Sequence, residues 1–175
     1  MQQTGLTSFN SLRTLGRIAA GSRVLILGGT SSTGLVAIQL AKAFGAVVIA
    51  TTCSAGSAAL VRKLGATDLV DYREEDVFAV MGAKKQRFDI IYDTVMVGKR
   101  GWEGAAAGAL AEGGQYVTIT GDAQVPLDIG DLLTRGYQIV SRNWFGFFSL
   151  GRARYHQYTQ LGGESENLEA VLTPF

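Results

Sequence analysis

The chain has few of the residues from which disulfides and metal sites are built. Its 175 residues include one cysteine, Cys53, and one histidine, His156. A lone cysteine cannot form an internal disulfide, and a single histidine leaves too few of the usual ligands for a zinc site. We therefore expect structural roles for both side chains and no bound metal.

An excess of charge and long apolar runs are also missing. Sixteen Lys and Arg residues face fifteen Asp and Glu residues, and no basic stretch offers the phosphate-binding face that nucleic acid needs. Apolar runs such as 24–27 and 46–50 are far too short to cross a bilayer, and the first residues lack a signal-peptide pattern. We predict no nucleic-acid partner and no membrane span, and leave the compartment open between cytoplasm and mitochondrial matrix.

What the sequence does contain is a regular alternation of β-branched runs and helical patterns. The length suits one domain, and 47% of the residues are hydrophobic. Such alternation predicts parallel strands joined by crossover helices. The expected strands are 23–27, 46–50, 68–70, 88–93, 115–120 and 137–140, and the expected helices are 34–44, 57–64 and a short one around 105–110. Six strands of this kind predict an α/β, doubly wound parallel sheet, the Rossmann fold.

Both ends of the chain look less self-contained than the middle. A lone amphipathic helix is expected at 6–18, before the first strand, and a C-terminal helical segment that includes 153–160 follows the sixth strand. The chain then stops directly after another helical stretch. We therefore expect residues 1–175 to be one Rossmann domain of a longer, two-domain protein.

A loop rich in small residues follows the first expected strand. Its members are Gly29, Thr30, Ser31, Ser32, Thr33 and Gly34. In the dinucleotide-binding pattern G-x-G-x-x-G the first glycine makes the tight turn, the second lets the backbone approach the pyrophosphate, and the third allows close packing of helix and strand. Here Ser31 stands in the second place. The alternative is an ordinary turn whose serines cap the helix, but its place between the first strand and a helix N-terminus favours a phosphate site.

Carboxylates are absent from the stretch after this loop. No Asp or Glu occurs between Gly34 and Asp68, whereas NAD-selective folds place one after the second strand to bind the ribose hydroxyls. The second strand instead leads into Ser54, and the cations Arg62 and Lys63 follow. A pocket of neutral hydroxyl groups suits a 2′-phosphate, so we predict NADPH as the cofactor. The two cations are either its partners or a solvated helix face, which makes Ser54 the stronger candidate.

Several segments together resemble a known family. GLTSFNSL (5–12), GSRVLILGG (21–29), AIQLAKAFGA (37–46), ALVRKLGATDLVDYREED (59–76), FDIIYDTV (88–95) and GGQYVTIT (113–120) are similar to the medium-chain dehydrogenase/reductases. The likeness is strongest to the zinc-free quinone oxidoreductase branch, and within it to the mitochondrial reticulon-interacting oxidoreductases. Thr4 stands where zinc-dependent relatives have a cysteine ligand, which agrees with that branch.

The resemblance implies a set of cofactor contacts. Residues 30–34 match the pyrophosphate loop, although the branch usually has Gly-Gly-Val where this chain has 31–33. Ser54 and Tyr72 match contacts of the 2′-phosphate and the adenosine ribose, and Thr94, Val95 and Thr120 match positions that line the nicotinamide half. It also implies a homodimer through the edge of the sixth strand, 137–140, beside the aromatic residues of 144–148.

The resemblance further implies a reductase that transfers hydride from NADPH to a quinone or an α,β-unsaturated carbonyl, its small-molecule electron acceptor. No catalytic residue can be assigned, and His156 lacks the acidic or nucleophilic neighbour of a general base. We expect this chain alone to be inactive. A short-chain dehydrogenase is excluded because none of the six tyrosines has a lysine four residues later. A non-catalytic NADPH-binding or interaction module remains the alternative.

Overall fold

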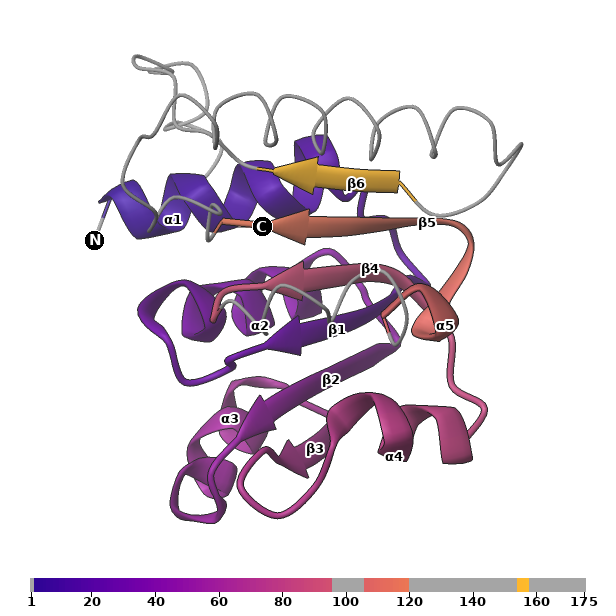
Figure 1. Cartoon of the computed structure of the whole chain (residues 1–175). Coiled ribbons are helices and arrows are strands. Elements are labelled where there is room, and N and C mark those ends of the chain that lie inside the picture. The colour runs from indigo at the N-terminus through magenta and orange to yellow at the C-terminus, as the bar shows by residue number, and fades with distance from the viewer. Residues whose placement is uncertain (1, 96–105, 120–153, 158–175) are drawn as a thin grey trace, which may run out of the picture.

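The computed structural model describes residues 2–95, 106–119 and 154–157. In this part of the chain six parallel strands form one sheet in the order β3-β2-β1-β4-β5-β6 (Figure 1). The strands are β1 Arg23–Leu27, β2 Val48–Cys53, β3 Asp68–Asp71, β4 Phe88–Asp93, β5 Leu110–Thr118 and β6 Arg154–Gln157. The order grows outward from β1 in both directions, so the predicted doubly wound α/β fold is confirmed.

Helices cover both faces of this sheet. On one face pack α1 (Gln2–Phe9) with the π-helical turn η1 (Asn10–Leu15), α2 (Ser32–Ala43), and α3 (Ala58–Leu64), which follows the short 3-10 turn η2 (Ala55–Ser57). On the other face pack α4 (Val77–Ala83) and the single turn α5 (Ala107–Ala109). Two helical layers explain why the central strands read as continuous apolar runs rather than as alternating ones.

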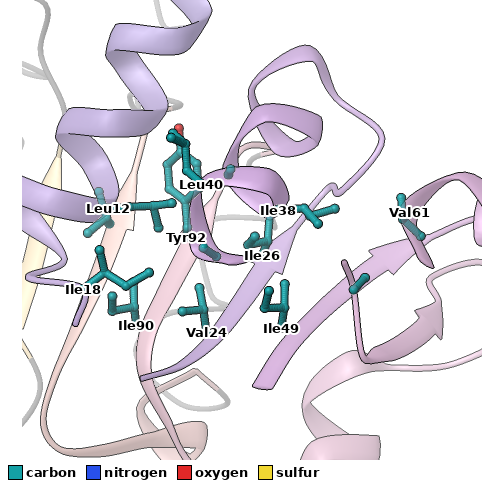
Figure 2. Packing of buried hydrophobic residues seen from close by; sticks show 14 of the residues in the cluster. Leu12, Ile18, Val24, Ile26, Ile38, Leu40, Ile49, Val61, Ile90 and Tyr92 are labelled. Atoms are coloured by element: carbon teal, nitrogen blue, oxygen red, sulfur yellow. The ribbon is translucent and has the colours of Figure 1, made fainter. Parts of the chain in front are cut away.

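Strand β1 shows how the two cores share one strand. Val24 and Ile26 belong to the cluster under α1, α2 and α3, whereas Leu25 and Leu27 belong to the cluster under α4. All four side chains are fully buried. Figure 2 shows the first cluster, in which Val24 and Ile26 lie among residues of the neighbouring strands and of the covering helices. This packing fixes the direction of β1 and therefore the place where the loop after it begins.

The edge of the sheet differs from the sequence prediction. The strand beside β5 is β6, in which Tyr155 and His156 pair in register with Tyr116 and Val117. We expected this segment to be helical, and that prediction is wrong: eight residues are too few for periodicity to separate helix from strand, and pairing with β5 decides. The expected sixth strand, 137–140, lies outside the described residues.

Candidate functional site

The glycine- and serine-rich loop lies at the carboxyl end of the central strand. Strand β1 has β2 on one side and β4 on the other, so the chain turns away in opposite directions from this point of the sheet. Open α/β sheets bind ligands in the crevice at such a switch point. In Figure 1 all six arrows point toward the edge of the sheet where this loop connects β1 to α2. The sequence prediction that this loop has the position of a ligand site therefore agrees with the topology.

Three glycines shape the loop, in a way that partly differs from expectation. We expected Gly29 to make the tight turn, but the left-handed conformation belongs to Gly28, whose φ is +83°. A Cβ built on Gly28 would overlap Val95 and lie 2.7 Å from Thr94 Oγ1. A Cβ on Gly34 would overlap the carbonyl oxygen of Gly28. Gly34 thus has the close-packing role expected of the third glycine, and Gly28 replaces Gly29 as the turn residue.

Two threonines of β2 hold the start of the loop. The N–H of Gly28 donates to Thr52 Oγ1 at 2.8 Å, and the N–H of Gly29 donates to the carbonyl of Thr52 at 3.0 Å. Thr51 Oγ1 donates to the carbonyl of Ile26 at 2.7 Å, and it occupies the space that a Cβ on Gly29 would need. Neither threonine was among the residues predicted for the site. The available signal was the placement of two hydroxyl residues inside an otherwise apolar strand.

The N-terminus of α2 has both a cap and open donors. Ser31 is the N-cap, and its Oγ accepts from the N–H of Gly34 at 2.9 Å. The N–H groups of Ser32 and Thr33 have no acceptor within the described part of the chain, and Ser32 is exposed. These two donors lie at the positive end of the α2 dipole, where an anion is stabilised. The capping interpretation and the phosphate interpretation are therefore compatible, because they use different residues.

A side-chain hydrogen bond joins the loop to the end of β4. Ser31 Oγ lies 2.8 Å from Thr94 Oγ1. The Thr94 hydroxyl also donates to the carbonyl of Leu27 at 2.8 Å, and Thr94 is buried. Val95, the next residue, is 47% exposed and contributes apolar surface beside the loop. Of the residues expected around the nicotinamide, Thr94 and Val95 thus lie next to the loop, while Thr120 lies outside the described residues.

The ends of β2 and β3 come together as the sequence predicts, with one addition. Cys53 pairs with Asp71, so Ser54 and Tyr72 both follow directly from paired positions. The addition is the carboxylate of Asp71, whose Oδ2 accepts from the N–H of Ala55 at 2.7 Å and whose Oδ1 accepts from the N–H of Arg73 at 3.0 Å. The Asp71 carboxylate was not predicted here, because it belongs to β3 and reaches the end of β2 only through the pairing of the two strands.

The exposed side chains here carry positive as well as negative charge. Tyr72 is 58% exposed, and the guanidinium carbon of Arg73 lies 5.8 Å from the centre of its ring. A hydrogen bond with Tyr72 raises the pKa of Arg73 further above its usual value, so this cation persists at any relevant pH. Ser54 is half-buried, and its Oγ lies 3.3 Å from Ser57 Oγ.

Two titratable side chains near the strand ends are buried. Asp93 is 3% exposed, and its carboxylate is hydrogen-bonded: Tyr116 donates to Oδ2 at 2.8 Å and the N–H of Val95 donates to Oδ1 at 3.0 Å. Cys53 is buried as well, and burial is the main cause that raises the pKa of its thiol, with the Asp71 charge adding to it. A neutral buried thiol has a structural role rather than a nucleophilic one.

Within residues 2–95, 106–119 and 154–157, no three His, Cys, Asp or Glu side chains gather as a metal ion would require. None of the helices in these ranges combines the length and the apolar character needed to cross a membrane.

The order of the strands and the loop at the switch point define a dinucleotide-binding type of Rossmann domain. Residues 32–162 match the family model described as "Zinc-binding dehydrogenase". The chain belongs to this family, and the resemblance to the medium-chain dehydrogenase/reductases seen in the sequence is confirmed. The described residues hold no cluster of ligands that fits the zinc of the family's description.

Individual relatives agree with the quinone oxidoreductase branch. The chain is 35% identical over 121 residues to 2-methylene-furan-3-one reductase of Solanum lycopersicum, which covers 69% of this chain and 29% of that protein. It is 43% identical over 94 residues to the bovine mitochondrial NAD(P)H oxidoreductase RTN4IP1, covering 51% and 23%. The quinone oxidoreductase of Coxiella burnetii superposes with a TM-score of 0.69 at 25% identity, covering 96% of this chain and 45% of that one. The chain thus spans less than a third of these two curated relatives.

Proposed function

We propose that residues 1–175 form the NADPH-binding domain of a reductase that transfers hydride to an α,β-unsaturated carbonyl or a quinone. The observation that carries the proposal is the N-terminus of α2 at the switch point of the sheet, where the N–H groups of Ser32 and Thr33 have no acceptor among the described residues. The relatives support the reaction class, since one is named for a 2-methylene ketone and another for oxidation of NAD(P)H.

The diphosphate would be held by main-chain groups. Gly28, Gly29 and Gly34 lie where any added Cβ would overlap a neighbour, so the loop backbone packs tightly against β2, β4 and α2. The two N–H groups of Ser32 and Thr33, together with the hydroxyls of Thr30 and Ser32, would donate to the phosphate oxygens. Both Thr30 and Ser32 are exposed.

The 2′-phosphate would bind between the ends of β2 and β3, at Ser54 and Tyr72. The carboxylate of Asp71 lies in the same region, but each of its oxygens already accepts a main-chain N–H, from Ala55 and from Arg73. Its charge is therefore partly compensated, and Arg73 adds a permanent cation beside Tyr72. These features favour a phosphate over a bare ribose.

The nicotinamide would lie at the ends of β4 and β5, near Thr94, Val95 and Thr120. The bound cofactor supplies the hydride. The protein residues orient the ring and exclude water. Val95 provides exposed apolar surface for this, and its position is held by a hydrogen bond of 3.0 Å from its N–H to the Asp93 carboxylate.

Titration of both nicotinamide cofactors tests the binding part of the proposal. Hydrogen bonds to a charged group contribute about 1.5–3 kcal/mol each, so one good contact should favour NADPH over NADH by at least about tenfold in Kd. Ser54→Ala and Tyr72→Phe should each reduce this preference and leave NADH binding almost unchanged. Gly56→Ala is a control for a change at the same turn, because a Cβ at Gly56 would meet nothing within 4 Å. Equal affinities in the unaltered chain, or a preference that survives both substitutions, would show that this pocket does not recognise the phosphate.

Turnover separates the reductase from a non-catalytic NADPH-binding module. We expect this chain to bind NADPH without oxidising it, because its described residues include no identifiable binding site for an acceptor beside the nicotinamide. A protein that joins this domain to a substrate domain should oxidise NADPH with an enone or quinone from a panel of acceptors. Tight NADPH binding with no acceptor-dependent oxidation in such a protein would favour the binding module.

We also propose a homodimer that forms through the edge of the sheet on the β5 side, where β6 is the outermost strand among the described residues. An edge strand has unpaired N–H and C=O groups that can pair with a second copy. Light scattering over a hundredfold range of protein concentration should give twice the 18.6 kDa chain mass at the upper end. A constant monomer mass would contradict the proposal.

A further inference from the structure

A series of hydrogen bonds connects the start of α2 to the end of β1 through Thr94, the residue that follows β4. The Thr94 hydroxyl donates its one proton to the carbonyl of Leu27 at 2.8 Å, with the carbonyl of Gly28 at 3.2 Å. The 2.8 Å contact with Ser31 Oγ therefore has Ser31 as the donor. Ser31 Oγ in turn accepts from the N–H of Gly34 at 2.9 Å. The hydroxyl protons of Ser31 and Thr94 thus both have an acceptor, and Thr33 Oγ1 lies 3.3 Å from Ser31 Oγ.

The engagement of Ser31 changes its expected role. Its hydroxyl is used for Gly34 and Thr94, and its main-chain N–H donates to the carbonyl of Gly28 at 2.9 Å. No donor of Ser31 remains to bind a phosphate. The open donors belong to Ser32 and Thr33, which directly follow it.

We propose that Ser31 and Thr94 are positioning residues, whose hydrogen bond fixes the diphosphate-binding loop against the end of β4. The inference rests on the proposed cofactor site and adds to it a dependence between its two halves. Thr94 lies on the nicotinamide side, yet it sets the geometry of the loop on the diphosphate side. Ser31, in place of the second glycine of the pattern, provides the side chain that makes this link possible.

A cofactor fragment without the nicotinamide distinguishes a positioning role from direct contact. The probe is 2′-phospho-ADP-ribose, titrated calorimetrically beside NADPH. Loss of one hydrogen bond is worth about 0.5–1.5 kcal/mol, so Thr94→Val should weaken the fragment about three- to tenfold and NADPH by at least as much. Thr94→Ser keeps the hydroxyl and should restore the affinity. If Thr94 only lines the nicotinamide, Thr94→Val will weaken NADPH and leave the fragment unchanged, which overturns the inference.

The matched control is Thr67→Val. Thr67 Oγ1 also hydrogen-bonds to strand backbone, accepting from the N–H of Ile49 at 3.0 Å, but at the amino end of β2. The Thr67→Val variant should have a lower free energy of unfolding and an unchanged affinity for either ligand. A loss of affinity in this variant equal to that of Thr94→Val would show a general effect of destabilisation and would overturn the inference.

A measurement without ligand keeps this inference separate from the proposed function. Amide hydrogen exchange at Gly34 should speed up in Thr94→Val, because Ser31 loses its partner and caps the helix less firmly. If the unaltered chain binds neither probe, the proposed function fails. Faster exchange in Thr94→Val would then still support the link between Ser31 and Thr94, and unchanged exchange would contradict it.

Discussion

At the scale of single residues, two helical glycines differ in the space around them. One could not accept a side chain, and the other could. Gly34 begins the packed part of α2, where a Cβ would overlap the Gly28 carbonyl and lie 2.9 Å from Ser31 Oγ. Gly82 lies inside α4, where a Cβ would meet nothing within 4 Å. Sequence patterns treat both as helical glycines, and only their neighbours distinguish them.

This difference gives a paired prediction. Gly34→Ala should lower the free energy of unfolding by about 1–3 kcal/mol, because main-chain atoms of the loop must move, and it should weaken NADPH binding. Gly82→Ala should raise that free energy by about 0.5–1 kcal/mol, since alanine loses less entropy in a helix. Urea unfolding of both variants measures the two changes. The same sign for both would contradict the close approach at Gly34.

At the scale of elements, the sequence predicted the central strands better than the edges of the domain. Strands β1 and β4 have the predicted bounds because their apolar runs are buried on both faces. Strand β2 begins later than predicted and continues through Thr51 and Thr52, polar residues that local hydropathy places outside a buried strand. Helix α4 was not among the predicted helices.

The candidate site was also predicted only in part. The loop was predicted because its residues are contiguous and follow a known pattern. The Asp71 carboxylate, the Ser31–Thr94 contact and the buried Asp93–Tyr116 pair each join residues from segments that are distant in the sequence. Only the register of the sheet brings these partners together, and a single sequence does not state that register.

Helix α4 did have a start signal, which makes it testable. Asp76 is the N-cap, and its Oδ1 accepts from the N–H groups of Phe78 at 2.8 Å and Ala79 at 2.9 Å. Asp76→Ala should lower the free energy of unfolding by about 1 kcal/mol, whereas Asp76→Ser should retain most of it. Glu75→Ala is the control, because that neighbouring side chain is exposed and makes no cap. Equal effects of the alanine changes at 75 and 76 would contradict a capping role for Asp76, as measured by urea unfolding.

At the scale of the whole molecule, the site links the two halves of the sheet on either side of β1. The loop contacts β2 through Thr52 and β4 through Thr94. A ligand that orders the loop therefore stabilises contacts on both sides of β1. Binding should consequently be visible as a change in the stability of the entire domain, not only as a local change.

Thermal unfolding with and without cofactor checks this expectation. A ligand that binds only the folded chain, present at one hundred times its Kd, adds about 2.7 kcal/mol to the free energy of unfolding. For a domain of this length each kcal/mol shifts Tm by about 2–4 °C, so NADPH should raise Tm by about 5–10 °C. NADH at the same concentration, with a Kd about tenfold higher, should raise it by about half as much. Ser54→Ala should bring the two shifts together by lowering the one for NADPH. Equal shifts in the unaltered chain would contradict the phosphate selectivity, and no shift with either cofactor would contradict the binding site itself.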